Sequence, residues 1–305
     1  MYKANADRVI YNVISESTQM GIAMENGSID MILTITGSEV SRFADEAGNA
    51  KAGYNVYGTL NTLIDCMFFN MDEGSIFADN LALRQAILYA IDTAGLVTVA
   101  LDGRGEQCYA FGSSVYADYL DEWIGHDYFN QDVEKAEALL AESGFDTATP
   151  LRIVLNGNAI RKSIAQIMQG YLAQIGITVE INSYEDSLFN TYKSDETAYD
   201  ILLDNCGGSD YLMTIWRGKF DAKAYSTGGT INGVYDDELQ SLMEACEKDN
   251  SKANMDAFQD CLYSHAYAVG LFNAQMYTVC RDSVKSISMD GKQFPCVASC
   301  TYSWN

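Results

Sequence analysis

Polar side chains follow several predicted strands at the points where those strands end, and they are the first candidates for chemistry. Asn156 precedes a glycine and a predicted helix that carries Arg161 in its first turn. A glycine lets the backbone approach a ligand, a helix start attracts anions, and a guanidinium can bind a carboxylate through two parallel hydrogen bonds. The pattern therefore indicates an anion contact at Arg161, with a solvated first-turn arginine as the alternative.

A second polar group, Tyr184, Glu185 and Asp186, ends the next predicted strand. The ring of Tyr184 could stack on a ligand, and the carboxylate of Glu185 could bind a cation. Asp186 is better placed as the cap of the following helix, because aspartate accepts the free amide hydrogens of a first turn. Phe68, on an earlier strand, is either an apolar wall of a binding cleft or a core residue.

Enzyme chemistry has little support in the sequence. It contains no Gly-x-Ser-x-Gly elbow, no Walker loop and no His-Glu-x-x-His zinc motif. His126 lies in a polar stretch that predicts exposure, whereas His265 continues the apolar face of a helix and should be half-buried. A Cys108–His126 dyad remains an alternative without a local motif. We therefore expect a protein that is not an enzyme and that needs no cofactor or metal.

The composition excludes several classes of protein. Among 305 residues, 42 are acidic and 19 are basic, which gives a formal net charge of −23. Such a chain repels nucleic-acid phosphates and anionic lipids, and it contains no apolar run long enough to span a membrane. Its eight cysteines show no Cys-x-x-Cys pair and no zinc spacing with the histidines, so we expect most of them to be small buried hydrophobes.

The elements that must position these residues form a clear α/β pattern, and the chain length predicts two domains. Periodicity and stop signals predict a β-α-β-α-β run with right-handed crossovers and a parallel sheet. Its elements are a preceding helix Val133–Ser143 between Asp132 and Gly144, a strand over 151–155, a helix over 160–175 ended by Gly176, a strand over 177–181, a helix Asp186–Tyr192 and a strand over 199–203.

The flanking segments are predicted to contain shorter elements. We expect a strand over 9–14, a helix over 19–26 ended by Gly27, a strand over 29–33 and a helix over 39–46 capped by Ser38. Two further helices are expected over 239–246 and 251–262, followed by short strands after Ala266.

Three motifs in register resemble one protein family. The segment 81–94 reads LALRQAILYAIDTA, with its apolar residues on one helical face, and follows Phe-Phe-Asn at 68–70. The segment 130–144 and the pair Tyr-Asp-Ile (199–201) with Ser-Asp-Tyr (209–211) match in the same order. Together they resemble the family 5 extracellular solute-binding proteins, the peptide- and nickel-type receptors of ABC importers.

The resemblance implies an α/β, type II periplasmic-binding-protein-like fold with one complete α/β lobe and part of a second lobe. Residues 1–60 would be the partial first lobe, 61–266 the second lobe with a parallel sheet core, and 267–305 the return to the first lobe. Hinge segments are expected near 59–62 and 265–269. A family member normally carries about two hundred further residues before Asp7, roughly one domain, so the chain resembles a carboxyl-terminal portion.

The same resemblance suggests a role for Asp210. In peptide-binding relatives, the aspartate of an Ala-Asp-Tyr motif meets the α-ammonium of the ligand, which implies a ligand site at Asp210 and its neighbour Tyr211. The sequence departs from the family pattern here, because Gly207 stands in place of a tryptophan and the segment is one residue longer. The alternative is that Asp210 caps the turn over 212–217.

The resemblance thus predicts the substrate-binding component of an ABC importer, which binds a peptide or similar small solute between its lobes and docks on a permease. It implies an extracellular or periplasmic location, with a membrane tether if a longer form carries a lipoprotein signal; residues 1–7 contain no such signal. The main alternative is a regulatory or interaction module without transport, which the genomic sequence upstream of Met1 would discriminate. A hydrolase is the second alternative, which the absence of a nucleophile motif from the sequence makes improbable.

Overall fold

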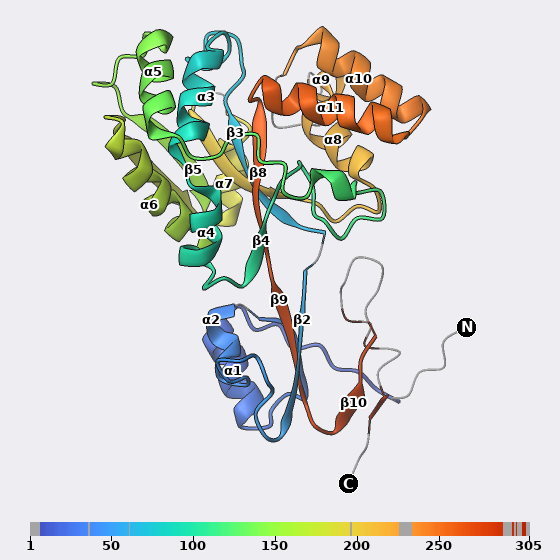
Figure 1. Cartoon of the computed structure of the whole chain (residues 1–305). Helices are drawn as coiled ribbons and strands as arrows, with labels where there is room; N and C mark the ends of the chain where they lie inside the picture. Colours follow the sequence, from blue (N-terminus) through green and yellow to red (C-terminus); the bar gives the residue numbers. More distant parts are fainter. Residues whose placement is uncertain are drawn as a thin grey trace.

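The computed structural model describes residues 7–35, 37–60, 62–195, 197–225, 234–288, 295, 297 and 301–302. Its described strands form a six-stranded sheet, a three-stranded sheet and a two-stranded ribbon. Figure 1 shows the six-stranded sheet among many helices and the three-stranded sheet with α1 and α2. We call the described residues from 64 to 274 the large region, and those before 60 and after 275 the small region.

The sheet of the large region has the strand order β4-β8-β3-β7-β5-β6. Its strands are β3 (Ile64–Phe69), β4 (Gly105–Gln107), β5 (Leu151–Asn156), β6 (Val179–Tyr184), β7 (Ile201–Cys206) and β8 (Ala268–Ala274). β5 pairs in parallel with both β6 and β7, which confirms the predicted β-α-β-α-β run. β3 pairs antiparallel with β7 and β8, so the complete sheet is mixed.

Helices cover this sheet. They are α3 (Leu81–Ala90), α4 (Thr93–Ala100), α5 (Val133–Ser143), α6 (Ala159–Gln174), α7 (Asp186–Tyr192), α8 (Leu212–Phe220), α9 (Ala222–Tyr225), α10 (Asp237–Lys248) and α11 (Lys252–Ser264), with a 3-10 turn at Asp121–Trp123. β6 and β7 flank β5 on opposite sides, so right-handed crossovers place α6 and α7 on opposite faces. Local signals fix the ends of α5: the Asp132 side chain accepts a hydrogen bond from the Lys135 amide, and Gly144 has a φ of 65°.

The segment 81–94, which carries part of the family resemblance and contains α3, contacts the end of another helix. Arg84 is 4% exposed, and its guanidinium donates to the backbone carbonyls of Phe77, Ala78 and His265. Gln85 Nε2 donates to the carbonyl of Ser264 at 3.3 Å. The carbonyls at the end of a helix lack partners within the helix and carry partial negative charge, so Arg84 and Gln85 complete the end of α11.

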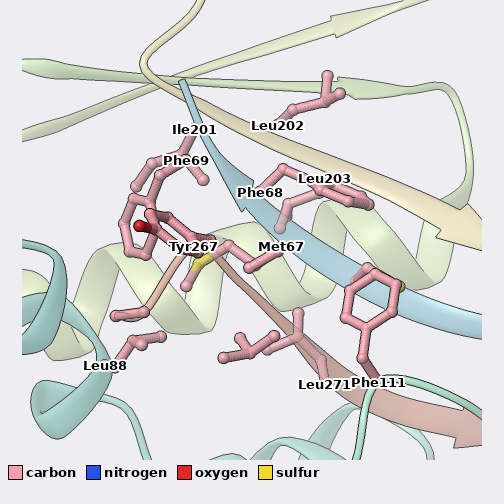
Figure 2. Close-up of a cluster of buried hydrophobic side chains, with 14 of the residues drawn as sticks. Met67, Phe68, Phe69, Leu88, Phe111, Ile201, Leu202, Leu203, Tyr267 and Leu271 are labelled. Atoms are coloured by element: carbon pink, nitrogen blue, oxygen red, sulfur yellow. The ribbon is translucent and has the colours of Figure 1, made fainter. Parts of the chain in front are cut away.

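The core of the large region lies on both faces of its central strands. Figure 2 shows Met67, Phe68 and Phe69 of β3 together with Ile201, Leu202 and Leu203 of β7 and with Leu271 of β8. These side chains are all less than 3% exposed. Burial on both faces explains why residues 66–69 of β3 and 201–203 of β7 read as continuous apolar runs instead of alternating ones.

The small region is thinner. Its elements are α1 (Ser17–Glu25), β1 (Met31–Ile35), α2 (Gly37–Val40), β2 (Tyr54–Thr59), β9 (Met276–Arg281), β10 (Val284–Ser286) and β11 (Thr301–Tyr302). β9 lies between β1 and β2, antiparallel to both, and β10 pairs with β11. In Figure 1, β2 leads upward into β3, and β8 leads downward into β9.

Two predicted elements of the small region are wrong. Residues 9–14 form no strand; they are irregular, and Val13 is 96% exposed, because no described strand offers them a hydrogen-bonded ladder. The helix expected over 39–46 ends at Val40. The chain turns there because Phe43 enters the core and the Asp45 carboxylate accepts a hydrogen bond from the Asn49 amide at 2.8 Å.

The return to the small region occurs later than residue 267. Ala268–Ala274 is strand β8, which pairs with β3 inside the six-stranded sheet, and β9 starts at Met276. The second crossing segment is therefore Gln275, not 265–269, and the first one lies between Thr59 and Ile64. The apolar run continues without a break through β8, so no sequence signal marks the earlier boundary.

Candidate functional site

The candidate site lies at one end of the six-stranded sheet, which we call the carboxyl edge. It consists of the carboxyl ends of β5, β6 and β7 and the start of β3, because Asn156 is paired with Tyr184 and Ile64 with Cys206. The crossing from the small region arrives here, and Gly208 N donates to Thr62 Oγ1 at 3.3 Å. In open α/β sheets, loops at this end bind ligands. Figure 1 shows that this edge faces the small region.

Arg161 is buried at the carboxyl edge, being 5% exposed. Asn158 caps α6 by accepting a hydrogen bond from the Arg161 amide, which fixes the first turn. The guanidinium Nε donates to Asp65 Oδ1 at 2.5 Å, and Nη1 donates to Asn156 Oδ1 at 2.8 Å. The alternative of a solvated arginine is thus wrong. The hydrogen bonds of this guanidinium among the described residues are made by Nε and Nη1.

A second carboxylate extends this arrangement. Asp204, at 5% exposure, has Oδ1 3.9 Å from Arg161 Nη1 and Oδ2 3.4 Å from Lys193 Nζ. We call Asp65, Asn156, Arg161, Lys193 and Asp204 the polar cluster. Its charges alternate, so each charged group faces an opposite one, as burial requires. Burial raises the pKa of the Asp65 carboxyl, and the neighbouring Arg161 opposes that rise.

Tyr184 and its neighbours form the β6 side of the edge. Tyr184 is half-buried, and its ring centroid lies 4.4 Å from that of Tyr192 on α7. Glu185 is exposed and occupies the N-cap position of α7 without a capping hydrogen bond from its side chain. Asp186 is not the cap that the sequence predicted: it is the first helical residue, and its Oδ1 accepts from Asn156 Nδ2 at 3.0 Å. This side therefore offers an aromatic pair and an exposed carboxylate.

The loop after β7 carries Asp210 and Tyr211, both exposed. Gly207 has a φ of 137° and packs against the Thr62 carbonyl so closely that a side chain there would clash with the crossing segment. Helix α8 then begins at Leu212, whose amide donates to both carboxylate oxygens of Asp118, at 3.1 and 3.2 Å. Asp118 thus satisfies the first backbone amide of α8.

Comparison with known proteins decides the family. The sequence model of the bacterial extracellular solute-binding proteins, family 5 (middle region), matches residues 2–220. The chain belongs to this family.

Curated relatives of this family 5 chain include the nickel-binding periplasmic protein of Escherichia coli K12. It is 28% identical over 195 residues, which are 59% of the chain and 36% of that protein. Heme-binding protein A of Haemophilus influenzae is 24% identical over 276 residues, covering 88% of the chain and 44% of that protein. The family 5 chain thus spans less than half the length of these two relatives.

Solved structures share its fold. The dipeptide-binding protein of Pseudoalteromonas sp. SM9913 in complex with Met-Leu superposes with a TM-score of 0.80 at 17% identity, covering 96% of the chain and 58% of that protein. The oligopeptide-binding protein AppA of Bacillus subtilis in complex with a nonapeptide gives 0.76 at 18% identity, covering 96% and 60%. At these identities the likeness establishes the type II periplasmic-binding-protein-like α/β fold.

Phe68 lies away from the carboxyl edge of the sheet. It is 1% exposed, and its ring packs edge-on against Phe111 with centroids 5.8 Å apart. Figure 2 shows both side chains within the buried cluster. The core alternative therefore describes Phe68 better than a cleft wall does.

The residues considered for catalysis are not arranged for it. His126 is exposed and stacks on Tyr128 at 4.3 Å between centroids, whereas Cys108 is 8% exposed and burial raises its pKa well above the usual value. A nucleophilic cysteine needs the opposite shift. His265 is half-buried, as predicted, with Nδ1 3.0 Å from the carbonyl oxygen of Cys261. The described residues contain no group of three or more side chains suited to a metal ion.

Sequence reasoning missed four charged residues near the edge: Asp65, Asp118, Lys193 and Asp204. Asp65 stands within an otherwise apolar strand and Asp204 directly follows three apolar residues, and a lone charge beside such a run signals a buried ion pair. Asp118 and Lys193 lie in polar segments and carry no comparable signal. Among the described helices, none is both long and apolar enough to cross a membrane.

Proposed function

We propose that this family 5 chain forms part of the solute receptor of an ABC importer and binds a peptide or similar small solute at the carboxyl edge. The observation that carries the proposal is the position of this edge beside both crossing segments. Thr59 pairs with Met276 at the end of the small sheet, and Asp65 pairs with Phe272 at the start of the large one. The two segments between them are short and adjacent.

Such paired crossings suit a hinge. A solute that contacts the carboxyl edge and the facing small region stabilises the closed arrangement over the open one, by its difference in affinity for the two. The closed form then docks on a permease. We place the receptor outside the cytoplasm, in keeping with the extracellular family to which the chain belongs.

Peptide is the solute class that the edge chemistry favours. The exposed carboxylates of Asp210 and Glu185 suit an ammonium group, the Tyr184–Tyr192 pair suits an apolar or aromatic side chain, and Arg161 Nη2 suits a carbonyl or carboxylate oxygen. Similar structures with bound peptides are those of the dipeptide-binding protein and AppA. Other relatives are named for nickel and heme, so the edge residues must set the choice.

The test uses the natural protein that contains this chain. Thermal denaturation and titration calorimetry are carried out with a pool of di- to pentapeptides, with nickel chloride and with heme. Peptides are expected to raise the melting temperature, and the best binder should lose at least tenfold in affinity when its amino terminus is acetylated. A well-folded protein that responds to none of these probes would favour the interaction module instead.

A further inference from the structure

Two cysteine side chains meet inside the large region. Cys66 on β3 and Cys206 on β7 are 0% and 4% exposed, and their sulfur atoms lie 3.2 Å apart. The two strands are neighbours in the sheet, with Cys66 paired with Asp204 and Ile64 with Cys206. The cysteines are therefore diagonal neighbours, offset by two residues on the same face of the strand pair, and both sulfurs lie in the same buried space.

This separation is close to what a covalent bond needs. A disulfide has an S–S distance of about 2.05 Å, so the sulfurs must approach by roughly 1.2 Å from their 3.2 Å separation. Because diagonal neighbours are farther apart than directly opposed residues, closing the bond requires a small local shift of the end of β7 as well as rotation about the side-chain bonds. We propose that Cys66 and Cys206 form a disulfide in the exported protein. The family is extracellular, and disulfides persist in oxidising compartments.

The reaction is a thiol–disulfide exchange with an external disulfide oxidant. The thiolate of one cysteine attacks a sulfur of the oxidant and releases one oxidant thiol. The second cysteine, as a thiolate, then attacks the mixed disulfide and releases the other. Two protein thiols lose two protons and two electrons, and the oxidant disulfide becomes two thiols. Burial raises the pKa of Cys66, so this step belongs to folding, before β3 and β7 close over the sulfurs.

The bond would act on the loop that carries Asp210. Cys206 is the last residue of β7, directly before Gly207 and Gly208, and that loop already contacts Thr62 of the first crossing segment. Cys66 lies three residues into β3 from the same crossing. A covalent link there joins positions 140 residues apart and fixes the base of the loop to the strand that enters the large region.

Cys108 provides the matched control. It is a third buried cysteine close by, because its Cβ lies 2.9 Å from where a side chain on Gly270 would begin, and Gly270 is paired with Cys66. Oxidation without positional preference would link Cys108 with either partner. The sulfur contact instead assigns the bond to Cys66 and Cys206.

The experiment refolds the purified chain in a buffer of oxidised and reduced glutathione. The protein is then unfolded in denaturant that contains N-ethylmaleimide, so that buried free thiols are blocked too, and unreduced proteolytic peptides are mapped by mass spectrometry. We expect a linked peptide pair containing Cys66 and Cys206, lost in Cys66→Ser and Cys206→Ser and retained in Cys108→Ser. Oxidised wild type should melt roughly 4–8 °C above the reduced form. Hydrogen exchange over 206–211 should be slower in the oxidised form.

The peptide map of the wild type decides the matter even if a serine variant fails to fold. Full maleimide labelling of both Cys66 and Cys206 in the refolded protein would overturn the proposal. A linked pair that contains Cys108 with either of them would overturn it equally. The proposal rests on the location outside the cytoplasm given in the proposed function, but the peptide map is read out independently of solute binding, so failure of one does not imply failure of the other.

Discussion

The large and small regions of this chain differ in how completely each buries its own apolar residues. The large region encloses one continuous core on both faces of a six-stranded sheet. The small region has a compact set around Phe43 and Val279, yet it leaves Val9, Ile10, Tyr11 and Val13 exposed at 45% to 96%. Apolar burial is the main favourable term in folding, so the large region should hold most of the stability of the chain.

Hydrogen exchange tests this difference where its effect is largest. The amides of β3 and β5, which have strand neighbours on both sides, should exchange only through global unfolding. The amides of 7–35 should exchange by local opening, at least about a thousandfold faster. Equal protection of β1 and β5 in a mass-spectrometric exchange series would show that the two regions unfold as one unit.

A pair of phenylalanines compares the two cores directly. Phe68 of the large region is 1% exposed and Phe43 of the small region is 0% exposed. Phe68→Ala should lower the free energy of unfolding in the main denaturant transition by about 3–5 kcal/mol. Phe43→Ala should leave that transition unchanged and speed exchange only in the small region. If both variants shift the main transition alike, the small region is not a separate unit.

The polar cluster tests whether the large region tolerates an unpaired charge. Arg161→Met leaves the carboxylates of Asp65 and Asp204 without their shared cation, at an expected cost of about 3–5 kcal/mol. The matched control is Arg152→Met on β5, whose pair with Asp200 is more exposed and should cost at most about 1 kcal/mol. Equal losses of unfolding free energy for the two variants in urea denaturation would contradict the expected difference between the buried and the more exposed ion pair.

The same variant has an expected pH dependence. Burial already raises the folded pKa of Asp65 above its unfolded value, and loss of Arg161 removes the opposing effect. A carboxyl with a raised folded pKa lowers the free energy of unfolding as pH rises from its unfolded pKa to its folded pKa. The loss of unfolding free energy in Arg161→Met should therefore be smaller at pH 5 than at pH 7. A deficit that is constant over this range would contradict the raised pKa of Asp65.

The smallest expected effect concerns Asp210. Asp210→Asn in the natural protein should weaken peptide binding at least tenfold, about 1.4 kcal/mol, without changing the melting temperature. Asp118→Ala is the control, because loss of the hydrogen bond to the Leu212 amide should cost about 1 kcal/mol of stability. Unchanged affinity in Asp210→Asn would rule out its ligand role.

The sequence predicts well what is decided locally. Asp132, Gly144 and Gly176 begin or end helices through their own hydrogen bonds or backbone angles, and the parallel run follows from those limits. Contacts between segments that are distant in the sequence are not predicted by such local signals. The burial of Arg161 depends on Asp65, 96 residues away, and no local pattern announces it. The apolar run over 9–14 resembles a strand, but a strand also needs a neighbour.

The position of β3 bears on how the chain is made and exported. This strand ends at Phe69, but its two neighbours, β7 and β8, begin only at Ile201 and Ala268. During synthesis β3 therefore has no ladder partner until β7, more than 130 residues later, has emerged. Closing such long loops before any contact forms is entropically costly and makes folding slow. Sheet order alone thus delays formation of the six-stranded sheet until residues far along the chain have been made, a delay of the kind that export of an unfolded polypeptide requires.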